Sequence, residues 1–315
     1  MRYSYHPDYF VSLPASHPFP MAKYPLLAER LLRRGVLAPG NAIEPAEASL
    51  ADLGLVHTSE YLQQLATGSL DAAAVRRIGV PWSPALWRRS RLAAQGTLEA
   101  ARAALQDGMA ANLAGGTHHA FADHGEGFCV LNDVAVAIRV LQRDAQLQRA
   151  LVIDLDVHQG NGTAAIFEDE SRVFTFSMHG ERNYPTRKMR STLDVGLADG
   201  IGDDEYLELL GGHLAAIFGC FEPDLVFYLA GVDPACGDRY GRLALTDEGL
   251  RRRERTVLQA CAARGLPVVI TIAGGYAPTP ARTADLHSMV FEEAVALQRA
   301  REHDCLRTHQ GVNER

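Results

Sequence analysis

The chain has 315 residues, of which 47% are hydrophobic and 22% are charged, and its formal net charge at pH 7 is -7. A chain of this length and composition can bury a sizeable core, as one large α/β domain or as two ordinary domains. The negative charge argues against nucleic acid or an anionic membrane surface as a partner, because either would repel the chain on average.

Short apolar stretches and helical patterns alternate along the chain and indicate an α/β fold. Buried strands are predicted at residues 109–112, 150–153, 173–177, 224–230 and 267–273. Helices are predicted between several of them, at residues 133–146, 203–218 and 246–264. Because parallel strands need long crossovers, which helices fill, we expect a parallel β-sheet flanked by helices on both faces. No internal repeat or low-complexity linker interrupts this pattern, so a single domain over residues 1–315 is expected.

Basic side chains gather at residues 251–255 and at Arg187, Lys188 and Arg190. The first stretch falls within a predicted helix, and the favoured interpretation is a solvated helix face. No direct contact with nucleic acid is therefore expected.

The cysteines indicate a reducing compartment, because their number is odd, no CxxC pair occurs and the chain is too long to need disulfides. They are Cys129, Cys220, Cys236, Cys261 and Cys305. The first ten residues lack the basic start and unbroken apolar core of a signal peptide, and no apolar run approaches membrane-spanning length. We expect a cytoplasmic protein without a membrane span.

Four of the predicted strands lead into polar or glycine-rich segments. These segments are GGTHHA, DLDVHQGNG, AGVDPACGD and AGGY. In open α/β sheets, ligands bind in the crevice outside the carboxyl ends of the strands. Asp, His and Tyr residues that lie far apart in the sequence are therefore expected to converge on one rim of the sheet.

The segment DLDVH carries the first candidate metal ligands. Asp156 and His158 lie two residues apart, so the alternation of a strand would point both side chains to the same side. A carboxylate and an imidazole suit zinc, and a third ligand from another strand leaves one position open for water. Asp233 follows the apolar run 225–229 and is the expected third ligand, because a buried carboxylate needs a partner. Alone, such an aspartate more often caps a turn, but together with DLDVH it indicates a metal site.

Two adjacent histidines, His118 and His119, follow Gly115 and Gly116. Adjacent residues of a strand cannot both point outward, so a loop is expected here, and the glycines allow its backbone to turn close to a substrate. An imidazole near an activated water is what general base chemistry at neutral pH requires.

Six motifs follow one another between residues 115 and 276, in the order GGTHHAF, GFCVLND, DLDVHQGNG, FSMH, AGVDPACGD and AGGY. In this order they resemble the histone deacetylase superfamily, which has the arginase/deacetylase fold. HPFPMAKY at residues 17–24, HQGNG and GDRYGRL look most like class IV deacetylases and their bacterial relatives. The resemblance implies a hydrolase that removes acetyl or longer fatty acyl groups from the ε-amine of lysine with a metal-activated water.

The resemblance also implies a role for each matching residue. Asp156, His158 and Asp233 are expected to hold one zinc ion, with His119 as the general base. Tyr276 is expected to donate its phenol hydrogen to the oxygen of the scissile amide.

Further roles are implied for the residues around these groups. His118 is expected to pair with Asp154, and Asn161 to orient His119 without adding negative charge, which leaves the imidazole less basic than a carboxylate partner would. A potassium ion is expected at Asp154, Ser177 and Met178.

Gly127 and Phe128 match one wall of the acyl-lysine tunnel, and Tyr184 is the candidate for the opposite wall. Cys129 beside this wall is expected to be a buried structural thiol and not a nucleophile, because the metal already supplies activated water.

Three alternatives remain at this stage. The related binuclear manganese ureohydrolases carry Asp-x-His-x-Asp, but Gly160 at the fifth position removes a bridging carboxylate and favours one zinc. An acetylpolyamine or another small amide is the rival substrate to an acyl-lysine protein or peptide. Polyamine-selective members tend to carry an acidic gatekeeper where this chain has Tyr240. A non-catalytic acyl-lysine binding module is disfavoured, because Tyr276, the base and the ligands are all present.

Overall fold

The computed structural model describes the backbone of residues 1–312 and the side chains of residues 1–301. Within this part of the chain, parallel strands form one eight-stranded sheet. The strands are β1 (Arg2–Ser4), β2 (Ala42–Ile43), β3 (Met109–Asn112), β4 (Ala150–Asp154), β5 (Val173–Gly180), β6 (Leu193–Leu197), β7 (Leu225–Leu229) and β8 (Val268–Thr271). Their order in the sheet is β2-β1-β3-β8-β7-β4-β5-β6.

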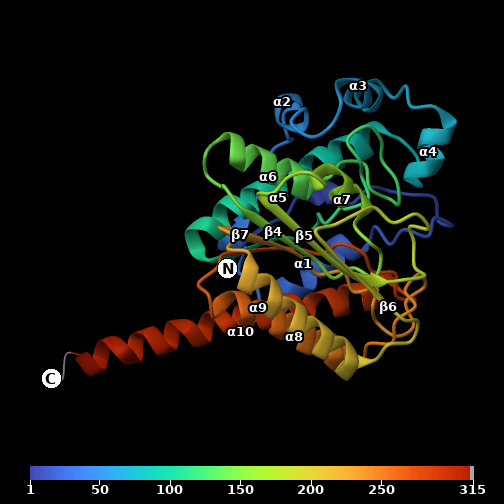
Figure 1. Ribbon diagram of the computed structural model, residues 1–315. Coiled ribbons are helices and arrows are strands. Elements are labelled where there is room, and N and C mark those ends of the chain that lie inside the picture. Colours follow the sequence, from blue (N-terminus) through green and yellow to red (C-terminus); the bar gives the residue numbers. More distant parts are fainter. Residues whose placement is uncertain (313–315) are drawn as a thin grey trace.

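Helices cover both faces of this sheet, as the sequence predicts. They are α1 (Lys23–Arg33), α2 (Leu50–Leu53), α3 (Ser59–Thr67), α4 (Ala72–Ile78), α5 (Pro84–Asp107), α6 (Asp133–Arg143), α7 (Asn161–Phe167), α8 (Asp203–Cys220), α9 (Asp247–Ala262) and α10 (Pro280–Val312), with 3-10 turns at η1 (Pro7–Tyr9) and η2 (Pro39–Asn41). Figure 1 shows α5 and α6 on one side of the sheet and α8, α9 and α10 on the other. The predicted α/β class and parallel sheet are confirmed.

The burial of the central strands explains why the sequence predicted them. Every residue of β3, β4, β7 and β8 is buried, so these strands appear as continuous apolar runs instead of alternating ones. The three strands that were not predicted are different. β1 and β2 have only three and two residues, and β6 alternates between exposed and half-buried positions at the edge of the sheet.

The longest helix of the first half, α5, also went unpredicted, although its ends carry clear signals. Ser83 caps the start by accepting a hydrogen bond from the backbone N–H of Leu86 at 3.0 Å, and Pro84 occupies the first turn. Gly108 ends the helix with φ +81°, in the left-handed region that glycine tolerates best. Buried alanines along its inner face let α5 pack closely on the sheet, and they blur the contrast between apolar and polar faces.

The register of the sheet aligns the carboxyl ends of β4, β7 and β8, whereas β5 continues beyond them to Gly180. Asp154, the last residue of β4, lies opposite Ser177 on one side and Leu229 on the other. Leu229 in turn lies opposite Thr271, the last residue of β8. The segments that follow these residues therefore begin at one edge of the sheet, and they carry the motifs singled out in the sequence.

The expectation that residues 251–255 form a solvated helix face is wrong in part. Arg253 is fully buried, and Arg251 and Arg255 form ion pairs with Glu292 and Glu293 of α10. The stretch joins α9 to α10 because its side chains reach carboxylates across the helix contact.

The described thiols form no disulfides: Cys129, Cys220, Cys236 and Cys261 are all free. The side chain of Cys305 lies outside the described residues. Cys129 is buried, and burial raises the pKa of its thiol, as expected for a structural cysteine. Among the described residues, no helix combines the length and the apolar character that crossing a membrane requires.

Candidate active site

The three predicted metal ligands lie together at the edge of the sheet. Asp156, His158 and Asp233 each offer a ligand atom within 4.8 Å of the others, and all three side chains are buried. The Nδ1 atom of His158 lies 2.9 Å from Asp156 Oδ1 and 3.2 Å from Asp233 Oδ2. One imidazole nitrogen and two carboxylate oxygens form a donor set that suits zinc.

The electrostatics of this group also fit a cation. Asp233 Oδ2 is buried and makes no hydrogen bond within the described part of the chain. Burial and the neighbouring Asp156 raise the pKa of Asp233, because two negative charges this close are costly in a dry interior unless a cation offsets them. These residues therefore fit a divalent metal ion.

The strand alternation used to predict this pair is wrong, although the pair does converge. Strand β4 ends at Asp154, so Asp156 and His158 lie in the bend that follows it. The bend is held by side-chain to backbone hydrogen bonds: Asp156 N donates to Asp154 Oδ1 at 3.2 Å, and His158 N donates to Asp156 Oδ1 at 2.9 Å. Aspartates that bind the backbone two residues on are a common way to form such turns.

Glycines leave the space that these carboxylates occupy. A Cβ atom at Gly274 would collide with the Oδ2 atoms of both Asp156 and Asp233. Instead, the backbone N–H of Gly274 donates to Asp156 Oδ2 at 2.7 Å. At Gly160 a Cβ atom would collide with Asp154 Oδ2, so a side chain there would displace the carboxylate that pairs with His118.

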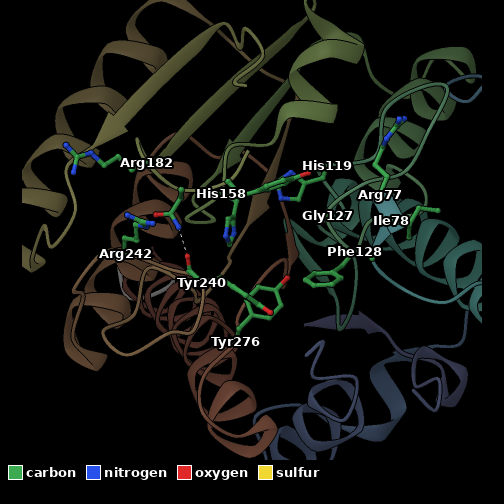
Figure 2. A pocket seen from close by; sticks show the side chains of 13 residues that line it. Arg77, Ile78, His119, Gly127, Phe128, His158, Arg182, Tyr240, Arg242 and Tyr276 are labelled. Carbon is green, nitrogen blue, oxygen red and sulfur yellow. Dashed lines mark hydrogen bonds between the residues drawn. The ribbon is translucent and has the colours of Figure 1, made fainter. Parts of the chain in front are cut away.

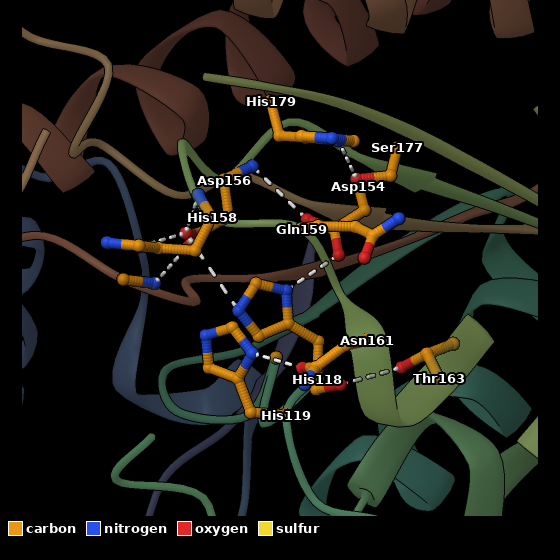
Figure 3. Close-up of polar contacts among 12 residues, drawn as sticks. His118, His119, Asp154, Asp156, His158, Gln159, Asn161, Thr163, Ser177 and His179 are labelled. Carbon is orange, nitrogen blue, oxygen red and sulfur yellow. Dashed lines mark hydrogen bonds and ion pairs between the residues drawn. The ribbon is translucent and has the colours of Figure 1, made fainter. Parts of the chain in front are cut away.

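The two adjacent histidines lie in the irregular loop after β3, as expected, and their rings are 4.1 Å apart between centroids. His118 Nδ1 lies 2.7 Å from Asp154 Oδ2, and His119 Nδ1 lies 2.6 Å from Asn161 Oδ1, the first residue of α7. Figure 3 shows the two pairs side by side. The structure thus brings together both predicted pairs.

The two histidines have opposite pKa shifts. Burial lowers the pKa of His118, but the carboxylates of Asp154 and Asp156 outweigh this effect and raise it to about 9. Burial and the neighbouring His118 and His158 hold the pKa of His119 well below its usual value. An imidazole that is neutral at pH 7 can accept a proton.

A cavity of about 390 Å³ opens beside this group. His119, His158 and Tyr276 line it, and aromatic rings form its walls (Figure 2). The ring of Tyr276 lies 6.4 Å from that of His158 and 4.9 Å from that of Tyr240, between centroids. Tyr276 thus lies at the same cavity as the candidate base and a metal ligand.

Gly127 and Phe128 form one wall of this cavity, as predicted. Phe128 has φ +67°, a conformation that side-chain-bearing residues rarely adopt, and its N–H donates to Ile78 O at 2.7 Å. A Cβ atom at Gly127 would lie 2.6 Å from His119 Cδ2, so glycine is needed where the wall passes the histidine.

Tyr184 also lines the cavity, on the loop after β5. Its ring is 5.0 Å from that of His119 and 6.3 Å from that of His158, between centroids. The side chain is 42% exposed, and its hydroxyl donates to Glu126 Oε1 at 2.7 Å. The structure therefore places Tyr184 at the mouth of the cavity, where the sequence predicts the opposite wall.

The residues expected to hold potassium also lie near one another. Ser177 and Asp154 are register partners on adjacent strands, and Met178 is fully buried next to Ser177. Ser177 Oγ lies 2.9 Å from His179 Nδ1.

Three buried or half-buried charges near the cavity were not predicted. Asp238 accepts hydrogen bonds from the backbone N–H groups of Tyr276 and Tyr240, at 2.6 and 2.9 Å, and so holds both tyrosines. Lys23 is fully buried and donates to Ala273 O at 2.9 Å. Glu126 accepts from Tyr184 and from Asn161 Nδ2. Charged residues inside the matched motifs HPFPMAKY and GDRYGRL were a usable signal for the first two, whereas Glu126 had none.

Known proteins are similar to this chain in sequence, and a solved structure is similar to it in fold. The model of the histone deacetylase domain matches residues 17–292. An uncharacterized protein of Picosynechococcus is 48% identical over 298 residues, which cover 95% of this chain and 97% of that protein. Histone deacetylase 2 of Arabidopsis thaliana is 32% identical over 282 residues, with 87% of this chain and 73% of the relative covered. The crystal structure of the HDA15 HD domain superposes with a TM-score of 0.77 at 24% identity, covering 95% of this chain and 90% of that one.

Proposed function

The chain belongs to the histone deacetylase family of hydrolases, and from this premise we propose that it is a zinc-dependent deacylase that acts on acyl-lysine. The observation that carries the proposal is the buried group of Asp156, His158 and Asp233, which lies beside a cavity that His119 and Tyr276 also line. A metal-ligand set, a base and a hydrogen-bond donor around one cavity are the groups that metal-assisted amide hydrolysis requires.

Asp156, His158 and Asp233 are the residues that would hold the metal. The chemistry that zinc supplies in such a site is Lewis acidity toward a carbonyl oxygen and a water molecule. We assign a single ion, because Gly160 stands where a second, bridging ion would need a carboxylate. A potassium ion at Asp154, Ser177 and Met178 remains a proposal from the family resemblance.

His119 is proposed to take the proton from the attacking water. Its Nδ1 atom is engaged by Asn161, which leaves Nε2 as the ring nitrogen that can accept a proton. The low pKa of His119, set by burial and by the neighbouring histidines, supports a neutral imidazole at the start of the reaction. His118 stays paired with Asp154 and is not needed as the base.

Tyr276 is proposed to donate a hydrogen bond to the oxygen that becomes negative when the amide carbon turns tetrahedral. Burial and the charges of Asp156 and Asp233 raise the pKa of Tyr276 well above its usual value, which keeps the phenol protonated. Asp238 accepts a hydrogen bond from the backbone N–H of Tyr276 and thereby fixes the backbone from which the ring projects.

The lining of the cavity favours acyl-lysine over an acetylated polyamine. Phe128, Tyr184 and Tyr240 give aromatic walls that suit the apolar stem of a lysine side chain. The described residues that line the cavity include Arg77, Arg182 and Arg242 but no Asp or Glu. Asp199 pairs with Arg182 and Arg242, so a polyamine would meet no free carboxylate among the lining residues to receive its additional positive charge.

The test is a turnover panel with the zinc-loaded protein. Acetyl-lysine and longer acyl-lysine peptides are compared with acetylpolyamines at equal concentration. The proposal expects the highest kcat/KM on an acyl-lysine peptide. A preference for the polyamine would mean that the substrate is an acetylpolyamine and not acyl-lysine. The absence of turnover on every compound would favour a non-catalytic binding module.

A further inference from the structure

Glu126 lies at the end of a chain of hydrogen bonds that starts at the candidate base. His119 Nδ1 lies 2.6 Å from Asn161 Oδ1, and Asn161 Nδ2 donates to Glu126 Oε1 at 2.6 Å. The same carboxylate oxygen accepts from the hydroxyl of Tyr184 at 2.7 Å. The side chain of Glu126 is only 17% exposed, so water competes little for these bonds.

The carboxylate determines which way the Asn161 amide faces. A carboxylate oxygen only accepts hydrogen bonds, so Asn161 must turn its NH₂ group toward Glu126. The amide oxygen then faces His119, as in the structure. Without a negative partner on the far side, the two faces of the amide would differ far less in energy, because an amide can donate or accept on either face.

The orientation of the amide in turn determines the tautomer of His119. An amide oxygen facing Nδ1 requires a hydrogen on Nδ1, which leaves the lone pair on Nε2. A flipped amide would donate to Nδ1 and stabilise the tautomer with its hydrogen on Nε2. In that tautomer, the free nitrogen could no longer accept a proton from water in the cavity.

The charge state of Glu126 suits this role. Burial raises its pKa, but the imidazole of His124, 3.8 Å away, and hydrogen bonds from Tyr184 and Asn161 outweigh that effect and lower it to about 2. The Glu126 side chain is therefore an anion at and around neutral pH.

We propose that Glu126 is a positioning residue that sets the tautomer of His119 through the amide of Asn161. The inference rests on the proposed function, because it assumes that His119 is the base. Glu126 places a negative charge next to the pair of His119 and Asn161, which the sequence alone predicts to be neutral. It also links the base to Tyr184, so that the wall of the cavity and the base share one anchor.

The kinetic test combines Glu126→Ala with Asn161→Asp. Glu126→Ala is expected to lower kcat by about tenfold to a hundredfold, the usual range for a residue that orients a functional group from behind. Asn161→Asp alone should also slow turnover, because two carboxylates would face each other where Asn161 now donates to Glu126.

The double variant separates positioning from a merely structural role. Aspartate at position 161 can only accept from Nδ1, so it no longer needs Glu126 to set its direction. Glu126→Ala/Asn161→Asp is therefore expected to turn over faster than Glu126→Ala. If the double variant is no faster, Glu126 acts only by supporting Tyr184 or the loop, and the proposal is wrong. Glu168→Ala is the matched control, since Glu168 is an exposed carboxylate at the end of α7, the helix that Asn161 begins, and lies outside the chain of bonds.

A second measurement does not depend on turnover. The ¹⁵N chemical shifts of His119, assigned by comparison with His119→Ala, report which ring nitrogen carries the hydrogen. The wild-type protein is expected to show hydrogen on Nδ1, and Glu126→Ala a mixture of tautomers. Unchanged shifts in Glu126→Ala would overturn the inference. Expected shifts in a protein without deacylase turnover would leave the inference standing and count against the proposed function alone.

Discussion

The backbone N–H of Val157 donates to Asp233 Oδ1 at 2.8 Å. Val157 lies between the two candidate ligands of one loop, and Asp233 is the ligand of another. One carboxylate oxygen thus holds the two loops together while the other, Oδ2, is left for a metal. Asp233 therefore both links the two loops and offers an oxygen atom to a metal ion.

Replacing Asp233 by asparagine is expected to abolish zinc retention. The amide removes the negative charge that offsets a cation, although it can still accept from Val157. Elemental analysis of the purified variant should find far less than one zinc per chain. Asp199→Asn, an exposed carboxylate paired with Arg242, is the control and should keep its zinc. Full zinc content in Asp233→Asn would remove Asp233 from the ligand set.

Replacing Tyr276 by phenylalanine is expected to slow turnover without loss of metal. The change removes one hydroxyl and keeps the ring contacts with Tyr240 and Phe128. The loss of one donor to a developing oxyanion typically lowers kcat by about a hundredfold to a thousandfold. Steady-state kinetics on zinc-loaded protein checks this, and a near wild-type kcat would mean that the metal alone polarises the carbonyl.

Arg253 connects the loops of the site to the helix layer, and its loss is expected to destabilise the fold. Its Nη1 atom donates to Leu155 O at 3.1 Å and to Gly231 O at 2.8 Å, and its Nη2 atom donates to Glu254. Arg253→Met would leave the Glu254 carboxylate buried without a cationic partner, with only the Tyr228 hydroxyl still bound to it, at a cost of about 3–5 kcal/mol in the free energy of unfolding.

Urea denaturation of the metal-free protein measures this cost. The neighbouring Arg252→Met is the control, because Arg252 is 43% exposed and pairs with an exposed Asp204. Its effect should stay within about 0.5 kcal/mol. Equal effects of the two substitutions would contradict the structural role assigned to Arg253.

His57 predicts a loss of stability in mild acid. The side chain is 2% exposed, its Nε2 atom accepts from Asn132 N at 3.0 Å, and burial lowers its pKa to about 4 despite backbone contacts that favour the charged form. The folded state resists protonation between the unfolded pKa of about 6.5 and this value, whereas the unfolded chain takes up the proton. His57 therefore lowers stability as the pH falls from 6.5 to 4, by up to about 1.4 kcal/mol per pH unit.

Comparison with His57→Gln isolates this effect. The free energy of unfolding of the metal-free protein is measured at pH 7 and at pH 4.5 for both chains. Relative to wild type, the free energy of unfolding of His57→Gln should be higher at pH 4.5 than at pH 7. A difference that does not depend on pH would show that His57 titrates normally in the folded state.

The sequence predicted the site better than it predicted the periphery of the fold. Buried central strands appear in the sequence as apolar runs, and the carboxyl ends of parallel strands meet at one edge of the sheet. These two rules were enough to predict that Asp156, His158 and Asp233 lie together. The geometry offered for the pair Asp156 and His158 was wrong, because side-chain hydrogen bonds end β4 at Asp154.

Glu126 shows why other parts of the site were not predictable. Its partners Asn161 and Tyr184 lie 35 and 58 residues away, on α7 and on the loop after β5. No spacing rule connects such positions, because only the packing of two loops brings them into contact. Edge strand β6 was missed for a related reason, since its half-exposed residues follow the sheet edge and not an apolar run.

The most direct test of the account is the dependence of deacylase turnover on zinc. The protein is stripped with a chelator, dialysed, and titrated with zinc while hydrolysis of an acyl-lysine peptide is measured. The account predicts that the stripped protein is inactive, that activity returns and saturates at one zinc per chain, and that Asp233→Asn recovers none. Turnover that persists in the stripped protein, or that zinc does not restore, would contradict it.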